Sequence, residues 1–125
     1  MPEQRTPADV AIAFTEAWTS HDMDTAARYV ADDVVFEGPL SQATGITEYI
    51  EGLSQFAQAV TGLEILAVVG DDERAMIMYE LTTRPFGTLR AAEDFVISGD
   101  KITRDTLVFD THAVREARES QTPSG

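Results

Sequence analysis

The sequence predicts an α+β domain in which a curved antiparallel sheet is covered on one face by helices. The first observation is that residues 63–110 divide into four stretches of alternating side chains, as strands do. The second is that these stretches are separated by the short turn sequences Gly70-Asp71-Asp72, Pro85-Phe86-Gly87 and Gly99-Asp100. The third is that residues 6–60 carry helical periodicity and can supply the cover that such a sheet needs.

Length and composition favour one globular domain over residues 1–125. The net charge of -13 argues against binding to nucleic acids or to anionic membranes, because both need clustered Lys and Arg. The absence of Cys excludes disulfides and thiolate zinc sites, and the sequence has no metal, phosphate-loop or dinucleotide motif. The N-terminus has no apolar segment of signal-peptide length. We therefore expect a cytoplasmic protein without metal, cofactor, nucleic-acid or membrane partners.

The elements follow in order from capping signals and periodicity. A first helix from Pro7 to about Ser20 is predicted because Thr6 can cap it and Asp9 can complete a capping box. We expect residues 111–125 to form a partly disordered tail. The other expected elements are helices over Met23–Val30 and Ile46–Val60, the latter with Gly62 as its C-cap, a short strand over Val34–Glu37, a loop to Gly45, and long strands over Leu63–Val69, Arg74–Thr83, Thr88–Ser98 and Lys101–Asp110.

Three stretches of the chain resemble the SnoaL-like branch of the nuclear-transport-factor-2-like (NTF2-like) superfamily. They are ADDVVFEGP after the first two helices, TGITEYIEGL at the start of the third, and AAEDFVISGDKITRDTLVFD at the end, and together they fall within Val10–Asp110. The resemblance implies a cone-shaped fold in which three N-terminal helices pack on a strongly curved antiparallel sheet and leave a small-molecule pocket. The superfamily includes isomerases, cyclases, epoxide hydrolases, dehydratases and proteins without catalysis, so the fold does not imply one activity.

The catalytic residues of two members of the superfamily are not retained. The oxyanion-hole Tyr, the general-base Asp and the protonated Asp of ketosteroid isomerase would correspond to Phe14, Gly38 and Glu93. Two of these three positions have therefore lost their chemistry. The two Asp residues of limonene epoxide hydrolase would fall near Met76 and Leu107. We expect neither reaction to transfer directly to this chain.

Two acids are the candidate catalytic residues. Glu93 alternates with its neighbours so that it shares a face with Phe95, and the resemblance implies that this face points into the pocket. A carboxyl group in apolar surroundings has a raised pKa and can act as a general acid or donate to a ligand carbonyl. Asp105 is the second acid expected near the pocket. The alternatives are that an Arg or Tyr inside the fold satisfies Glu93, and that Asp105 lies at the rim or pairs with Arg90 or Arg104.

Residues 74–83 alternate between two apolar faces, so periodicity alone does not orient this strand. We expect Met76 and Met78 to face the pocket, because flexible Met side chains suit an irregular apolar ligand. We expect the other face to form a sheet-mediated homodimer through Ala75, Ile77, Tyr79 and Leu81. The full set expected in the pocket wall is Phe14, Trp18, Tyr29, Phe36, Tyr49, Phe56, Met76, Met78, Phe95, Leu107 and Phe109.

Two functions remain open at this point. The first is a cofactor-independent isomerase, cyclase or hydrolase that acts on a small apolar carbonyl-bearing compound through the carboxyl groups of Glu93 and Asp105. The second is a non-catalytic ligand-binding or dimeric assembly module of the same fold. A Glu93 carboxyl that is free in the pocket would favour the enzyme, and one that is locked to an Arg would favour the second function.

Overall fold

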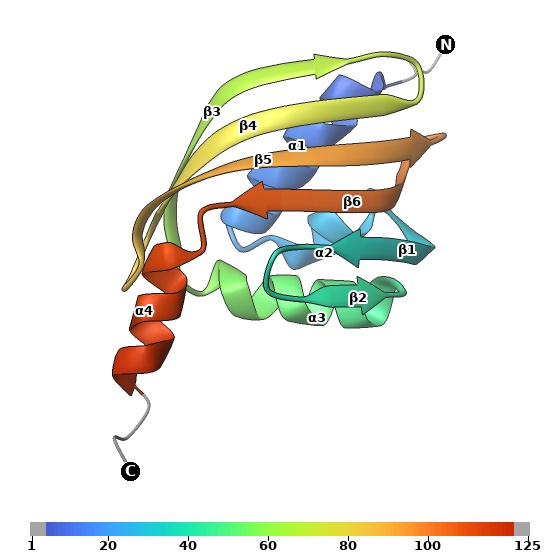
Figure 1. Ribbon diagram of the computed structural model, residues 1–125. Helices are drawn as coiled ribbons and strands as arrows, with labels where there is room; N and C mark the ends of the chain where they lie inside the picture. The colour runs from blue at the N-terminus through green and yellow to red at the C-terminus, as the bar shows by residue number, and fades with distance from the viewer. Residues whose placement is uncertain (1–4, 122–125) are drawn as a thin grey trace.

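A computed structural model describes residues 5–121 of the chain, and it has the α+β architecture that the sequence predicts (Figure 1). Two helices, two short strands and a third helix come first, and four long strands and a last helix follow. In chain order the elements are α1 (Pro7–Thr19), α2 (Met23–Ala27), β1 (Val30–Glu37), β2 (Gln42–Thr44), α3 (Ile46–Ala57), β3 (Val60–Gly70), β4 (Arg74–Thr83), β5 (Gly87–Ser98), β6 (Lys101–Phe109) and α4 (His112–Gln121).

The strands form one curved sheet in the order β2-β1-β6-β5-β4-β3. Strands β3 to β6 pair antiparallel in sequence order, so the predicted meander is confirmed. The β1–β6 pair is parallel, which the expectation of a purely antiparallel sheet did not include. α1 packs against β3 and β4, and α3 packs against β1 and β2. Figure 1 shows α1 and α3 on the concave side of the sheet.

The start of α1 is as predicted. The Thr6 hydroxyl accepts a hydrogen bond from the Asp9 backbone N–H at 3.1 Å, and the Asp9 carboxylate accepts one from the Thr6 backbone N–H at 3.3 Å. This reciprocal pair satisfies two of the backbone donors that a helix N-terminus leaves free. The apolar face that follows, which includes Val10 and Phe14, is fully buried against the sheet.

Three boundaries in the first half differ from the prediction. The second helix ends at Ala27, because Val30 already belongs to β1, which pairs with Ile102 of β6. The expected loop before Gly45 contains the short strand β2, which pairs with β1. The third helix ends at Ala57 with Gln58 as its C-cap, so Gly62 lies inside β3 and the predicted cap is wrong. In each case strand pairing decided the boundary, with β6 for Val30, with β1 for β2 and with β4 for the start of β3.

The C-terminal segment forms the helix α4, where the sequence led us to expect a partly disordered tail. The Asp110 carboxylate accepts a hydrogen bond from the His112 backbone N–H at 3.0 Å at the start of this helix. Val114 is buried, so the helix is held to the body of the protein by at least one apolar contact. Residues 122–125, which belonged to the same expectation, lie outside the described part of the chain.

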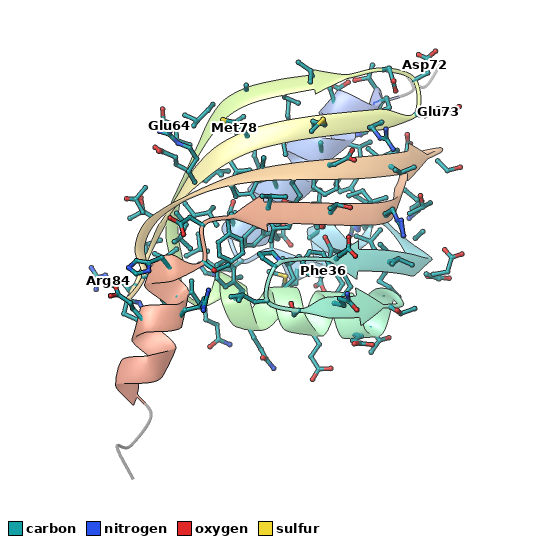
Figure 2. The ribbon with its side chains drawn as sticks, in the orientation of Figure 1. Phe36, Glu64, Asp72, Glu73, Met78 and Arg84 are labelled. Carbon is teal, nitrogen blue, oxygen red and sulfur yellow. The ribbon has the colours of Figure 1, made fainter. Side chains whose placement is uncertain are left out.

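Strand β4 presents its faces in the opposite sense to the prediction. Met76 and Met78 are 48% and 43% exposed on the outer face, and Figure 2 shows Met78 on the side of the sheet away from α1. The inner face carries the buried side chains Ala75, Ile77, Tyr79 and Leu81, so the expected pocket role of the Met residues and the expected dimer face are both wrong. The phase follows from register, because Ile77 lies opposite Glu93, whose side chain faces inward.

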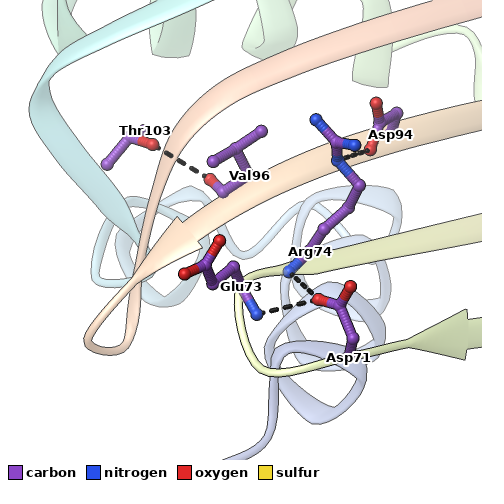
Figure 3. Close-up of polar contacts among 6 residues, drawn as sticks. All are labelled: Asp71, Glu73, Arg74, Asp94, Val96 and Thr103. Carbon is purple, nitrogen blue, oxygen red and sulfur yellow. Dashed lines mark hydrogen bonds and ion pairs between the residues drawn. The ribbon is translucent and has the colours of Figure 1, made fainter.

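The outer face also carries ion pairs. Figure 3 shows the β3–β4 turn, where one carboxylate oxygen of Asp71 accepts the backbone N–H groups of Glu73 and Arg74, each at 2.9 Å. The Arg74 side chain lies 3.2 Å from the Asp94 carboxylate on β5. A second cross-strand pair joins Glu80 and Arg90 at 2.7 Å. These exposed pairs each stabilise the fold by at most about 1 kcal/mol.

Candidate functional site

A pocket of about 820 Å³ lies between the concave face of the sheet and the helices. The sheet supplies residues of β4, β5 and β6, and the opposite wall comes from the end of α1, from α3 and from the β1–β2 connection. Its wall is mostly apolar and aromatic, as ligand pockets usually are. The predicted residues that line it are Trp18, Phe36, Tyr49, Phe56, Leu107 and Phe109.

The other predicted wall residues lie elsewhere. Phe14 and Phe95 are fully buried and are not among the residues that line this pocket. They support the wall from behind, because Phe14 stacks on Tyr49 with ring centroids 6.1 Å apart and meets Phe95 edge-on at 5.7 Å. Tyr29 is half-buried away from the pocket, with the Arg5 guanidinium 5.3 Å from its ring centroid. Its predicted place in the pocket wall is therefore wrong.

The two predicted acids come together on the inner face of the sheet. Glu93 lies on β5 and is 4% exposed, and Asp105 lies on β6 and is fully buried. The β5–β6 register pairs Glu93 with Leu107 and Phe95 with Asp105, so the two acids are diagonal neighbours on one face. Glu93 lines the pocket, and Asp105 lies behind the wall. We call Glu93 and Asp105 the acid pair.

Each acid is held by a tyrosine and not by an arginine. The Tyr79 hydroxyl donates to Glu93 Oε1 at 2.6 Å, and the Tyr49 hydroxyl donates to Asp105 Oδ2 in a short hydrogen bond. Burial raises the pKa of both tyrosines well above the ordinary value, so both hydroxyls remain protonated donors. Of the alternatives that the sequence left open, the tyrosine partner for Glu93 is the one found.

The surroundings of the acid pair favour retention of a proton. Burial raises the pKa of Asp105 well above its ordinary value, and the negative charge of Glu93 raises it further, while the bond from Tyr49 opposes the shift. Burial also raises the pKa of Glu93, although hydrogen bonds with Asp105 and Tyr79 counteract part of the effect. Asp105 Oδ1 is buried and meets no donor, which a proton on that oxygen, directed toward Glu93, would explain. Two buried carboxylates cannot both ionise cheaply at this separation, so the proton belongs to the pair.

Gly38, which would correspond to the general-base Asp of ketosteroid isomerase, can carry a larger side chain only if the Phe36 ring shifts. A Cβ atom at Gly38 would lie 2.8 Å from the Cζ atom of Phe36, whose ring lines the pocket. Neither His residue contributes, since His21 and His112 are both exposed. Within residues 5–121, no group of three or more His, Asp or Glu residues has a geometry that could hold a metal ion. Over the same residues, no helix is long and apolar enough to cross a membrane.

The sequence analysis missed Tyr79 as a site residue, because it placed this side chain on the outer face. The cross-strand register would have revealed it, since Tyr79 lies opposite Ala91, which shares the inner face with Glu93. It also missed the contribution of the β1–β2 connection, which supplies the pocket with Pro39, Leu40 and Ser41. Val114 of α4 lines the pocket as well and was hidden in the expected tail.

Comparison with known proteins gives a family and several similar structures. A model of the SnoaL-like domain matches residues 11–115. A protein from Kribbella flavida DSM 17836 is 30% identical with a TM-score of 0.88, and the match covers 93% of this chain and 96% of that chain. No curated protein matches the sequence.

Two more distant structures share the fold. An NTF2-like protein of unknown function from Cytophaga hutchinsonii ATCC 33406 is 16% identical with a TM-score of 0.78, covering 92% of this chain and 99% of that one. An LEH-like epoxide hydrolase from M. tuberculosis is 21% identical with a TM-score of 0.75, covering 92% and 90%. The SnoaL-like match spans most of the chain and agrees with these structures. The chain therefore belongs to the SnoaL-like domain family, with the NTF2-like fold.

Proposed function

We propose that this protein is an enzyme that moves a proton on a small, mostly apolar compound bearing a carbonyl group, with Glu93 as the group that exchanges the proton. The observation that carries the proposal is the acid pair, which has one member in the wall of an apolar pocket and the other sealed behind it. Carboxyl groups with raised pKa values in a concave pocket are typical of acid/base sites.

The roles of the two acids differ because their environments differ. Asp105 is fully buried and keeps the proton of the pair, which makes it a hydrogen-bond donor to Glu93. Glu93 reaches the pocket as the carboxylate and accepts a proton from the carbon next to the ligand carbonyl. It then returns the proton, either to the same carbon or to another carbon of the conjugated system. Tyr79 fixes the orientation of Glu93 during this exchange.

The comparisons support the architecture of the proposed site. The epoxide hydrolase from M. tuberculosis has the same fold at 21% identity, so it supports the architecture alone. Its chemistry does not transfer as it stands, because the positions expected for two limonene epoxide hydrolase acids hold Met76 and Leu107. An enolisation reaction requires only a general base and a hydrogen-bond donor to the carbonyl oxygen. It therefore fits the groups in this pocket better than epoxide opening does.

Hydrogen–deuterium exchange tests this proposal without knowledge of the natural substrate. The bicyclic ketone 1-tetralone in D₂O buffer exchanges the protons of C2, and proton NMR follows their loss. We expect the wild-type protein to accelerate the exchange, and Glu93→Gln to slow the accelerated rate by about 10²- to 10⁴-fold. Glu80→Gln is the matched control, because Glu80 lies on the outer face in its pair with Arg90. Exchange at the buffer rate with wild type, or equal rates with Glu93→Gln, would refute the proposal.

A second function, homodimeric assembly, is supported by the outer face of the sheet. Ala67, Met78, Ala92 and Val108 lie opposite one another on consecutive strands and form a continuous apolar strip across β3 to β6. Met78 is 43% exposed and Val108 is 62% exposed. An exposed apolar strip of this kind favours an interface with a second copy of the chain, since single exposed apolar residues are common but a continuous row is not.

Sedimentation analysis of Val108→Lys tests the dimer. We expect wild type to sediment at twice the mass of the 13.7 kDa chain and the variant to sediment as the monomer, because a buried unpaired charge opposes the interface. Thr61→Lys, an exposed substitution at the beginning of β3 and outside the apolar strip, is the control and should remain dimeric. A monomeric wild type would refute assembly through this face.

A further inference from the structure

Among the described residues that line the pocket, Trp18 carries a buried side-chain donor that has no partner in the protein. The hydroxyl groups of Tyr49 and Tyr79 both donate to the acid pair. The indole N–H of Trp18 is buried and has no hydrogen-bond partner, although Trp18 lines the pocket and is only 3% exposed. Indole nitrogen can only donate, and no acceptor among the described residues lies within hydrogen-bond distance of it.

An unpartnered buried donor destabilises a protein by about 1–3 kcal/mol, so its presence calls for an explanation. A Phe at position 18 would have no buried donor. Phe14, one helical turn earlier on the same face of α1, is such a residue, because its side chain carries no polar atom. Helix α1 also buries the hydroxyl groups of Thr15 and Thr19, but of these three residues only Trp18 lines the pocket, so its N–H is the polar group that a ligand can meet. A ligand oxygen is the acceptor that would satisfy it.

The backbone holds Trp18 firmly. It lies in the last turn of α1, where its carbonyl accepts from the His21 N–H at 3.2 Å and the adjacent Ala17 carbonyl accepts from the Asp22 N–H at 2.9 Å. The indole ring lies against Phe56, with ring centroids 6.2 Å apart and planes tilted by 47°. A donor fixed in this way stabilises developing charge without reorganisation during the reaction.

We propose that the Trp18 N–H donates a hydrogen bond to the carbonyl oxygen of the ligand whose neighbouring carbon loses a proton to Glu93, which makes enolisable neutral ketones the substrate class. This inference rests on the proposed function. Trp18 comes from the helical wall and Glu93 from the sheet wall, so a ligand between them meets a donor on one side and a base on the other.

The chemical step balances with these two groups alone. The C–H bond breaks, its proton goes to Glu93, and its electron pair forms the carbon–carbon double bond of an enolate. The carbonyl oxygen gains negative charge, and the hydrogen bond from Trp18 strengthens as that charge develops. Return of the proton from Glu93 regenerates the carbonyl.

The chain has a single Trp, so one indole resonance reports directly on this contact. The experiment uses protein labelled with ¹⁵N at the indole and titrates it with 1-tetralone or with tetralin, which has the same rings and no oxygen. We expect 1-tetralone to move the indole proton resonance downfield, as hydrogen bonding to an acceptor does, and tetralin not to do so. We expect Trp18→Phe to weaken 1-tetralone binding by about tenfold while it changes tetralin binding little.

The outcomes separate the two proposals. In one outcome, 1-tetralone binds and its exchange depends on Glu93, but the indole resonance does not move and Trp18→Phe still prefers the ketone to tetralin. The role of Trp18 is then wrong, and the proposed function stands. If the wild-type protein neither binds 1-tetralone nor exchanges its C2 protons, the proposed function is wrong and the role of Trp18 fails with it.

Discussion

Replacement of Asp105 by Asn should make the protein increasingly more stable than wild type as the pH rises. The pKa of Asp105 is raised by burial and by the charge of Glu93, so the folded state binds the proton more tightly than the unfolded state does. The stability that this proton contributes is fully present below the unfolded pKa of about 3.9 and is lost as the pH rises through the folded pKa. Asn has the shape of the neutral acid and cannot ionise.

The size of the effect follows from the number of protons involved. While the unfolded Asp105 is ionised and the folded Asp105 keeps its proton, wild type loses about 1.4 kcal/mol of stability per pH unit through this group. The difference between Asp105→Asn and wild type should therefore grow at about that rate above pH 4 and level off once the folded Asp105 has ionised. The Asn oxygen can still accept the bond from Tyr49, and its amide can donate toward Glu93 as the protonated acid does.

Urea unfolding between about pH 4.5 and 8.5, followed by the fluorescence of the buried Trp18, measures this difference. Repulsion within a chain of net charge -13 also lowers stability at high pH, but it affects both proteins and cancels in the comparison. Asp72→Asn is the control, because Asp72 is exposed in the β3–β4 turn (Figure 2). A stability difference for Asp105→Asn that stays constant across the pH range would show that Asp105 titrates normally in the folded protein.

Three further substitutions test separate parts of the structure. Gly38→Ala should weaken 1-tetralone binding, because the new Cβ would lie 2.8 Å from Cζ of Phe36 and force this pocket-lining ring to shift; unchanged affinity would contradict this. Thr6→Ala should lower stability by about 1 kcal/mol in urea unfolding through loss of the α1 cap, and an unchanged midpoint would speak against the capping box. Tyr79→Phe should raise the pKa of Glu93 further, because the hydrogen bond from the Tyr79 hydroxyl lowers this pKa in wild type and the variant lacks it. Carbon NMR of the Glu93 carboxyl group checks the direction of the shift.

The acid pair was predicted from strand alternation, which groups Glu93 with Phe95 and Asp105 with Leu107, together with the family resemblance, which implied the inward face. Glu93 alternates in phase with Phe95 and Ile97, and the structure buries all three on the concave side. Asp105 was predicted near the pocket, but its full burial depends on Tyr49 of α3, which is distant in the chain. Local periodicity carries no information on such a partner.

Strand β4 shows where periodicity fails. Both of its faces are apolar, so Met78 and Tyr79 were equally good candidates for the inner face. Only the register with β5 decides between them, because it places Tyr79 opposite Ala91. The boundaries of β1 and α4 could not be predicted for a related reason. Val30 is a strand residue because it pairs with Ile102 of β6. Val114 is buried because it packs into the wall of the pocket.

Carbon NMR of the side-chain carboxyl groups tests most directly whether Glu93 and Asp105 share a proton. Samples labelled with ¹³C at the carboxyl carbons of Asp and Glu, assigned with Glu93→Gln and Asp105→Asn, are titrated from acid to alkaline pH. We expect both resonances to change at pH values above the ordinary range of about 4, and each resonance to show two steps because the protons leave the pair one after the other. Single midpoints near 4 for both groups, each unaffected by substitution of the other, would contradict a shared proton and with it the proposed chemistry.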